Sequence, residues 1–110
     1  MVTVAETGEF IRQARRLLKE EEREALVSFL AGHPEAGVLI EETGGIRKLR
    51  WARQGRGKSG GARAIYYYHS DRMPLYLLTL YGKGDKSDLT AAEKHELRGL
   101  VDLLKKANGL

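Results

Sequence analysis

A group of lysines and arginines in the middle of the chain has the residue types and spacing best suited to chemistry. Residues 44–63 hold seven basic side chains and no acidic one, whereas the other ninety residues carry 12 basic and 15 acidic side chains. Like charges at this density repel one another and destabilise the fold unless an anion neutralises them. The segment therefore predicts a polyanion site formed by Arg47, Lys48, Arg50, Arg53, Arg56, Lys58 and Arg63.

If the polyanion is RNA, the same cations could support cleavage of its backbone. Attack by a 2′-hydroxyl needs one group that takes its proton, one that protonates the leaving 5′-oxygen, and cations that stabilise the phosphate. Arginine stays protonated in proteins, whereas lysine surrounded by other cations gives up its proton more readily. We predict phosphate stabilisation by arginines and proton transfer by lysines, without assigning acid and base among the lysines. The candidates are Arg50 and Arg63 for the first role and Lys48, Lys58, Lys83 and Lys86 for the second.

Other chemistries are poorly supported. Residues 55–60 spell G-x-G-x-x-G, but the segment leads into a strand, and Ala52 occupies the position where a P-loop needs glycine. The chain has no cysteine and three scattered histidines, so no metal site or cofactor is expected. Five tyrosines interleave with the cations, and alternation leaves only one or two of them for stacking on a base. We predict Tyr81 in that role.

Two strands must position the cations. From Ile46 the pattern has a period of two, which points Leu49 and Trp51 toward a core and Lys48 and Arg50 toward the opposite face. Residues 53–62 are predicted to be a glycine-rich loop, and 63–68 a second strand that begins at Arg63. A third strand, at 75–81, is apolar enough to be central.

Helices are predicted both before and after these strands along the chain. A short strand at 2–4 precedes an apolar helical pattern over residues 10–30, which fits one helix or two, and compactness favours two. Residues 38–40 could form an edge strand, and the capping box of Thr90 and Glu93 opens a last helix. This order predicts one α+β domain over 1–110, with helices packed on an antiparallel sheet. The absence of a signal peptide or apolar span suggests a cytoplasmic protein with no membrane contact.

Three stretches of the chain carry a family resemblance. They are residues 46–52 (Ile-Arg-Lys-Leu-Arg-Trp-Ala), 55–68 and 77–90. They resemble the RelE/HigB family of type II toxin–antitoxin toxins, and its HigB-like branch in particular. The resemblance implies a RelE-like fold of the microbial-ribonuclease type. It also implies an mRNA interferase, an endoribonuclease that cuts mRNA in the ribosomal A site, acts poorly on free RNA and is held inactive by a cognate antitoxin.

The resemblance can be followed residue by residue. Arg63 matches the family's arginine at the start of the strand after the loop, and Lys48 and Arg50 match the basic pair on the preceding strand. Gly84 stands where the RelE pattern has an arginine, and Thr90 lies near the position of a family tyrosine. Lys83 and Lys86 are the residues that could substitute.

Two functions from different classes follow from these residues. The first is a ribosome-dependent toxin that cleaves mRNA and inhibits translation. The second is a non-catalytic module that binds RNA or the ribosome with the same cations. The antitoxin would either lay an acidic segment over Arg50 and Arg63 or block access to the ribosome from a distance.

Overall fold

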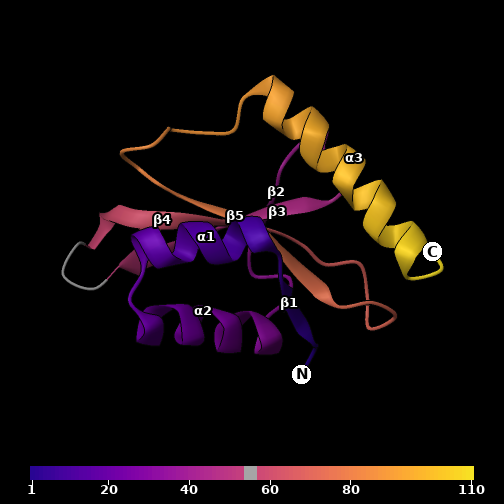
Figure 1. Ribbon diagram of the computed structural model, residues 1–110, viewed down its shortest axis with the longest axis horizontal. Helices are drawn as coiled ribbons and strands as arrows, with labels where there is room; N and C mark the ends of the chain where they lie inside the picture. Colours follow the sequence, from indigo (N-terminus) through magenta and orange to yellow (C-terminus); the bar gives the residue numbers. More distant parts are fainter. Residues whose placement is uncertain (54–56) are drawn as a thin grey trace.

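A computed structural model describes the backbone of residues 1–53 and 57–110, and side chains outside residues 52–60. Five strands form one sheet and three helices cover it (Figure 1). The elements in chain order are β1 (Val4–Glu6), α1 (Gly8–Leu17), α2 (Glu20–Gly32), β2 (Val38–Leu39), β3 (Ile46–Arg53), β4 (Gly57–Tyr67), β5 (Leu75–Gly82) and α3 (Ala91–Ala107). No helix in the described part of the chain is long and apolar enough to cross a membrane.

The α+β prediction is confirmed, with one difference in the sheet. The strand order is β1-β5-β4-β3-β2, and the neighbours from β2 to β5 are antiparallel as expected. β1, however, pairs in parallel with β5, where Val4 lies opposite Leu75. The sheet is therefore mixed, because the first strand joins the edge of the last one across some seventy residues of sequence.

The N-terminal segment forms two helices, as compactness favoured. The Oγ1 of Thr7 caps α1 by accepting the Phe10 N–H at 3.2 Å, and it lies 2.9 Å from the Leu77 carbonyl oxygen, to which it donates. The backbone is extended at Leu18 and Lys19, which ends α1 and starts α2. Thr7 thus fixes the start of α1 against β5 and determines which side chains of α1 border that strand.

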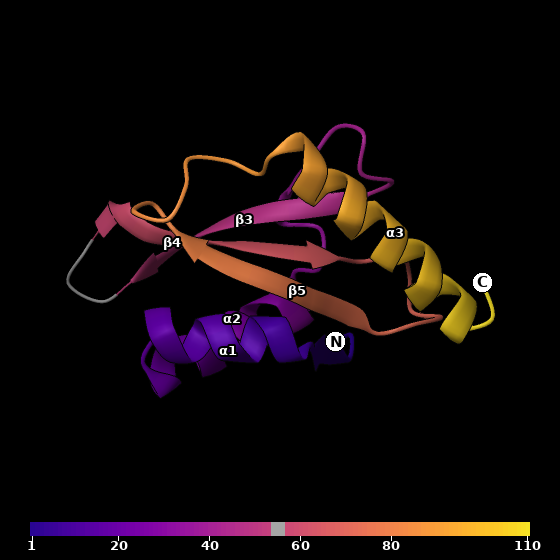
Figure 2. The same ribbon diagram turned by 45° about the horizontal axis from the view of Figure 1, so that its top comes forward.

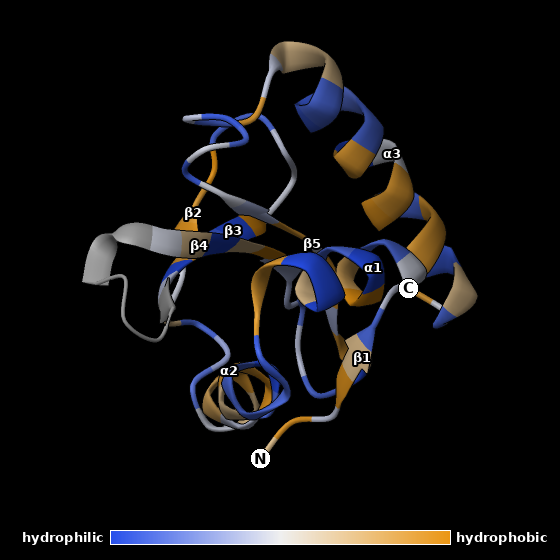
Figure 3. Ribbon diagram, turned by 60° about the vertical axis from the view of Figure 1, so that its left-hand side comes forward, coloured by the Kyte–Doolittle hydropathy of each residue, from blue (hydrophilic) through white to orange (hydrophobic). Residues whose placement is uncertain are grey.

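Two apolar clusters lie on opposite faces of the sheet (Figure 2). On one face α1 and α2 bury Phe10, Leu26 and Leu30 against residues that include Tyr66 and Leu77. On the other face α3 contributes the buried Val101, with the half-buried Leu97, Leu100 and Leu104 beside it. Figure 3 shows α3 as an amphipathic helix, with hydrophobic and hydrophilic residues alternating along its coil. The capping box predicted for its start is present, because Thr90 and Glu93 hydrogen-bond each other's backbone N–H.

The hairpin that carries the cations is longer than predicted. Most of residues 53–62, expected to be a loop, belongs to strands: β3 continues to Arg53 and β4 starts at Gly57. Trp51 pairs with Ala62 and Arg53 with Gly57 across this extension. Strand pairing therefore overrides the weak strand propensity of glycine here. Residues 54–56, between the two strands, lie outside the described structure.

An irregularity in β5 sets which side chains share a face. Ile65 of β4 pairs with Thr79, whereas the next residue, Tyr66, pairs with Leu77, so Leu78 is an extra residue in β5. Plain alternation from Leu77 would place Tyr81 on the α1–α2 face. The bulge reverses this phase and brings Tyr81 to the α3 face, directly opposite Arg63.

Candidate functional site

The α3 face of β3 and β4 carries three cations, Lys48, Arg50 and Arg63, which we call the cationic face. Arg50 and Arg63 are direct cross-strand partners. Lys48 lies opposite Ile65, whose side chain belongs to the cluster under α3, so all three cations share this face. The strand therefore has the two faces that its alternation predicted, with Leu49 and Trp51 packed against the opposite cluster.

Arg50 and Arg63 have no carboxylate partner among the residues that the structure describes. Arg50 is exposed, and Nη1 of Arg63 lies 3.5 Å from the Gly61 carbonyl oxygen. Like charges directly opposite each other on neighbouring strands repel, so this pair is destabilising by itself. An anion bound between the two guanidinium groups would remove the repulsion, and a phosphate oxygen pair suits their fork geometry.

Lys48 is tied to the loop that leads into α3. Its Nζ lies 3.4 Å from Oδ1 of Asp88, and both side chains are partly exposed. The pKa of Asp88 lies below its ordinary value because its carboxylate accepts the Leu89 N–H, with the positive charge of Lys48 and then of Lys94 adding to the effect. Asp88 therefore stays ionised and holds the loop against β3 at the border of the cationic face.

Tyr81 separates the cationic face from the space beneath α3. Its side chain is 3% exposed, and its hydroxyl is buried without a hydrogen-bond partner in the described structure. Burial raises its pKa most, the charges of Asp88 and Glu93 raise it further, and Arg63 opposes them. So little of its side chain is exposed that a base could reach the ring only from the neighbouring cavity, and the stacking role of Tyr81 stays a prediction.

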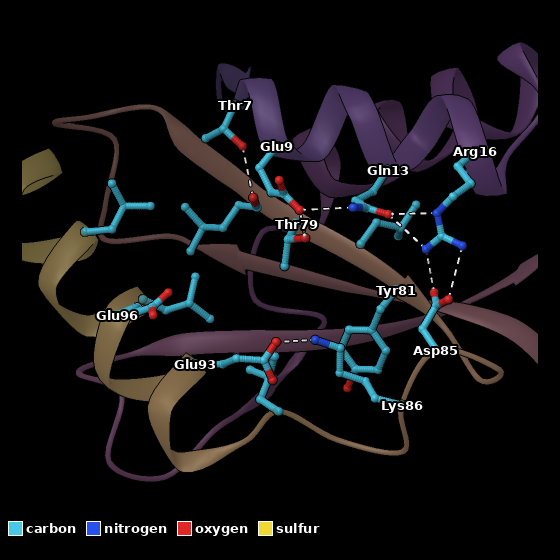
Figure 4. Close-up of a pocket in the computed structure, with 15 residues that line it drawn as sticks. Thr7, Glu9, Gln13, Arg16, Thr79, Tyr81, Asp85, Lys86, Glu93 and Glu96 are labelled. Carbon is cyan, nitrogen blue, oxygen red and sulfur yellow. Dashed lines mark hydrogen bonds and ion pairs between the residues drawn. The ribbon is translucent and has the colours of Figure 1, made fainter.

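Beyond Tyr81 lies a cavity of about 660 Å³ between α1, β5 and α3 (Figure 4). Its leucine floor includes Leu78, Leu80 and Leu97, and polar side chains of α1 and α3 form its sides. β1 pairs only with residues 75–77 of β5, so the later part of that strand edge lines the cavity. The volume is in the range of ligand-binding pockets.

Two ion pairs frame this cavity. Arg16 of α1 reaches Asp85 at 2.6 Å, and Lys86 pairs with Glu93 at the start of α3. Figure 4 shows both pairs extending from the turn after β5. Nζ of Lys86 also lies 5.4 Å from the centre of the Tyr81 ring. Lys86 and Tyr81 therefore line the cavity, whereas Lys48, Arg50 and Arg63 lie outside its lining.

The structure brings some of the predicted site residues together and separates others. Lys83 is exposed on the turn after β5, without an ion pair to any described residue. Arg47 lies on the other face of β3, opposite Tyr66, where its Nη1 donates to the Gly37 carbonyl oxygen at 2.8 Å and its Nη2 lies 3.7 Å from Glu35. Arg47 thus binds the loop that precedes β2 and is not part of the cationic face. The side chains of Arg53, Arg56 and Lys58 lie outside the described structure.

The fold and its cations agree with a known family. A family model described as the RelE toxin of the RelE / RelB toxin–antitoxin system matches residues 4–109 of the chain. The chain belongs to the RelE toxin family. As a RelE-family protein it is the toxin component of a toxin–antitoxin system, and an antitoxin is its partner. The resemblance read from residues 46–90 is thereby confirmed at the level of the family.

Sequence reasoning missed two features that lie near the cationic face of this RelE-family protein. Asp88 escaped attention because it lies 40 residues from Lys48 in a short polar turn. The cavity depends on Glu9, Gln13 and Arg16 of α1, which amphipathicity alone would assign to solvent. The signal for α1 was weak but present, since Glu9, Gln13 and Arg16 recur at helical spacing and lie on one side of the helix.

Proposed function

We propose that this RelE-family toxin is a ribosome-dependent endoribonuclease of the HigB-like branch that cleaves mRNA in the ribosomal A site in the cytoplasm and inhibits translation. The observation that carries the proposal is the pairing of Arg50 with Arg63 on an open face, with no described carboxylate beside them. A protein gains nothing in stability from that arrangement, whereas a phosphodiester bound there would gain two charge-assisted contacts.

The proposed reaction begins with attack of the mRNA 2′-hydroxyl oxygen on the adjacent phosphorus. The bond from phosphorus to the 5′-oxygen breaks, which leaves a 2′,3′-cyclic phosphate and a free 5′-hydroxyl. Arg50 and Arg63 would stabilise the extra negative charge on the phosphate oxygens. The scheme uses no metal ion or cofactor, because it assigns charge stabilisation to the arginines and proton transfer to lysines.

Proton transfer falls to the lysines near these arginines. Lys48 is the described lysine on the same face, and Asp88 keeps its amine at the border of the site. Lys83 is exposed and unpaired within the described structure, whereas the Lys86 amine is held by Glu93. Lys58 stays a candidate from the sequence. Among the described lysines, Lys48 and Lys83 are therefore better placed than Lys86 to exchange a proton with RNA.

Cleavage of translated and untranslated message by the pure protein tests this proposal. Purified ribosomes would be supplied with one message that carries a start codon and one that lacks it, and the cut sites would be mapped. We expect cuts within the reading frame of the translated message only. Binding to both messages without a cut would instead support the non-catalytic RNA- or ribosome-binding module.

A further inference from the structure

A second group of basic side chains lies at the start of α3. We call Lys94, His95 and Arg98 the basic turn. Together with Ala91 and Glu42 they line a depression of about 390 Å³ between the beginning of α3 and the loop before β3. Glu42 is the one acid in this lining, and it is exposed. The cavity framed by Arg16 and Lys86 does not include the basic turn, so the depression is a separate feature.

Two of the three side chains of the basic turn have no polar partner among the described residues. Neither His95 nor Arg98 has a side-chain hydrogen bond or ion pair with any described residue, although the stem of Arg98 lies beside Gly44. These side chains stand near the N-terminal end of a 17-residue helix, where the helix dipole adds positive potential. An anion in the depression would therefore meet several donors and little competing negative charge.

The basic turn is connected to the cationic face through one carboxylate. Asp88 pairs with Lys48 of β3 at 3.4 Å, and the charge of Lys94 also acts on Asp88 and lowers its pKa. Figures 1 and 2 show the start of α3 above the β2–β3 side of the sheet, joined to β5 by the loop that contains Asp88. Asp88 thus lies on the loop between a cation of the sheet and the start of the helix.

We propose that the basic turn is a second phosphate-binding site, which continues the RNA path from the cationic face across the 83–90 loop onto α3. The proposal rests on the function given above, because it needs RNA on the cationic face. A single-stranded RNA has a phosphate at every nucleotide, so a chain held at Arg50 and Arg63 that runs along β3 toward Gly44 can place a later phosphate beside Lys94 and Arg98. The phosphate belongs either to the message or to ribosomal RNA, and the experiment separates these sources.

Two double variants of α3 with the same change in charge form a matched test. Lys94→Glu with Arg98→Glu alters the basic turn, and Lys105→Glu with Lys106→Glu alters the far end of the same helix. The probes are a 2′-O-methyl RNA oligonucleotide, which cannot be cleaved, and ribosomes carrying a message. Circular dichroism and urea unfolding verify each fold, and the pair Lys94→Gln with Arg98→Gln replaces the glutamate variant if that one fails to fold.

We expect the basic-turn variant to bind the oligonucleotide about tenfold or more weakly, with the salt dependence of log affinity reduced by about 1.4, roughly 0.7 for each of two phosphates. The Lys105/Lys106 variant should stay within about twofold of the wild type, which is small beside a tenfold loss of 1.4 kcal/mol. A loss seen only with ribosomes supports ribosomal RNA as the source of the phosphate. Equal losses in both variants, or no loss with either probe, overturn the proposal. Cleavage of translated message by the wild type, measured separately, decides the proposed function itself.

Discussion

Arg16, Arg23 and Arg47, which we call the framework arginines, connect elements of the fold to one another. Their surroundings are opposite to those of Arg50 and Arg63 on the cationic face. In the framework, Arg16 reaches Asp85 at 2.6 Å, Arg23 reaches Glu6 at 2.8 Å, and Arg47 donates to the Gly37 carbonyl oxygen. On the cationic face, Arg50 and Arg63 face each other and have no carboxylate partner among the described residues. The chain has 15 acidic residues, so acids were available to pair with them.

This difference separates two uses of the same side chain. Framework arginines connect elements that are distant in sequence, as Arg16 does for α1 and the turn after β5. Most of their donors are bound by carboxylates or carbonyl oxygens of the protein, although Nε of Arg47 is buried without a partner among the described residues. Arg50 and Arg63 keep their donors open, at some cost in stability, and this is expected only where an external anion completes the site.

The largest effect should come from Arg63→Ala. It removes a phosphate contact from the cationic face while leaving every framework ion pair in place. We expect ribosome-dependent cutting of message to fall roughly 100- to 1,000-fold and growth arrest on expression to disappear. The urea unfolding midpoint should not fall and should rise slightly, because the repulsion between Arg63 and Arg50 is removed. Arg47→Ala is the matched control, because it should lower stability and leave cutting by the folded protein nearly intact. Full toxicity of the Arg63 variant would show that the arginines of the cationic face are no more important for cleavage than the framework arginines.

Gly37→Ala should be the strongest test of the framework. A Cβ at this position would lie 2.8 Å from Oη of Tyr66 and 3.0 Å from the Lys48 carbonyl oxygen, and the Gly37 N–H donates to that tyrosine hydroxyl. The substitution should reduce the free energy of unfolding by roughly 1–3 kcal/mol. Urea unfolding measures the change, with Gly32→Ala as the control, since nothing lies within 4 Å of a Cβ there. Equal stability of the two variants would mean that the segment around Gly37, just before β2, can move to accommodate the extra methyl group.

Arg50→Glu sharpens the comparison through the antitoxin. If the antitoxin covers the cationic face with an acidic segment, charge reversal at an exposed position should weaken the complex about tenfold or more. Calorimetry with the purified antitoxin measures the affinity, and Arg12→Glu on the exposed side of α1 is the control. Unchanged affinity of the Arg50 variant would show that the antitoxin acts from another surface.

The smallest expected effect concerns acid stability. The pKa of Asp85 is held below its ordinary value of 3.8, first by Arg16 and then by the Gly82 N–H. A carboxylate with a lowered folded-state pKa stabilises the fold above its ordinary pKa, and this contribution is lost as the pH falls through the lowered value. The wild type should therefore lose stability more steeply than Asp85→Asn below about pH 4. Urea unfolding of both proteins at several pH values from 7 to 2 measures this. The same decrease in the free energy of unfolding for both proteins below about pH 4 would contradict the prediction.

Local patterns were sufficient to predict most of the fold. The capping box at Thr90, the two N-terminal helices and the alternation in β3 each depend on residues close in sequence. The concentration of charge in residues 44–63 likewise pointed to the two strands that carry Lys48, Arg50 and Arg63 on one face. These features could be predicted because their physical causes act over a few residues.

The remaining features depend on contacts between distant segments. The parallel pairing of β1 with β5 joins the first strand to the last one, and the extra residue Leu78 reverses the phase of β5 without any mark in its composition. Arg47 looks like its neighbours in sequence, yet alternation and the Gly37 carbonyl oxygen direct it to the framework. Charge pattern alone therefore could not separate the arginines of the cationic face from Arg47, which supports the fold.

The most direct test of the central claim separates affinity from turnover in the Arg63 variant. Binding would be measured with ribosomes carrying a message that has a single 2′-deoxynucleotide at the cleavage site, and turnover with the same message in its natural form. We predict that Arg63→Ala loses only a fewfold in affinity while its cleavage rate falls by about two orders of magnitude or more. A parallel loss in both quantities would contradict the account and leave Arg50 and Arg63 as binding residues alone.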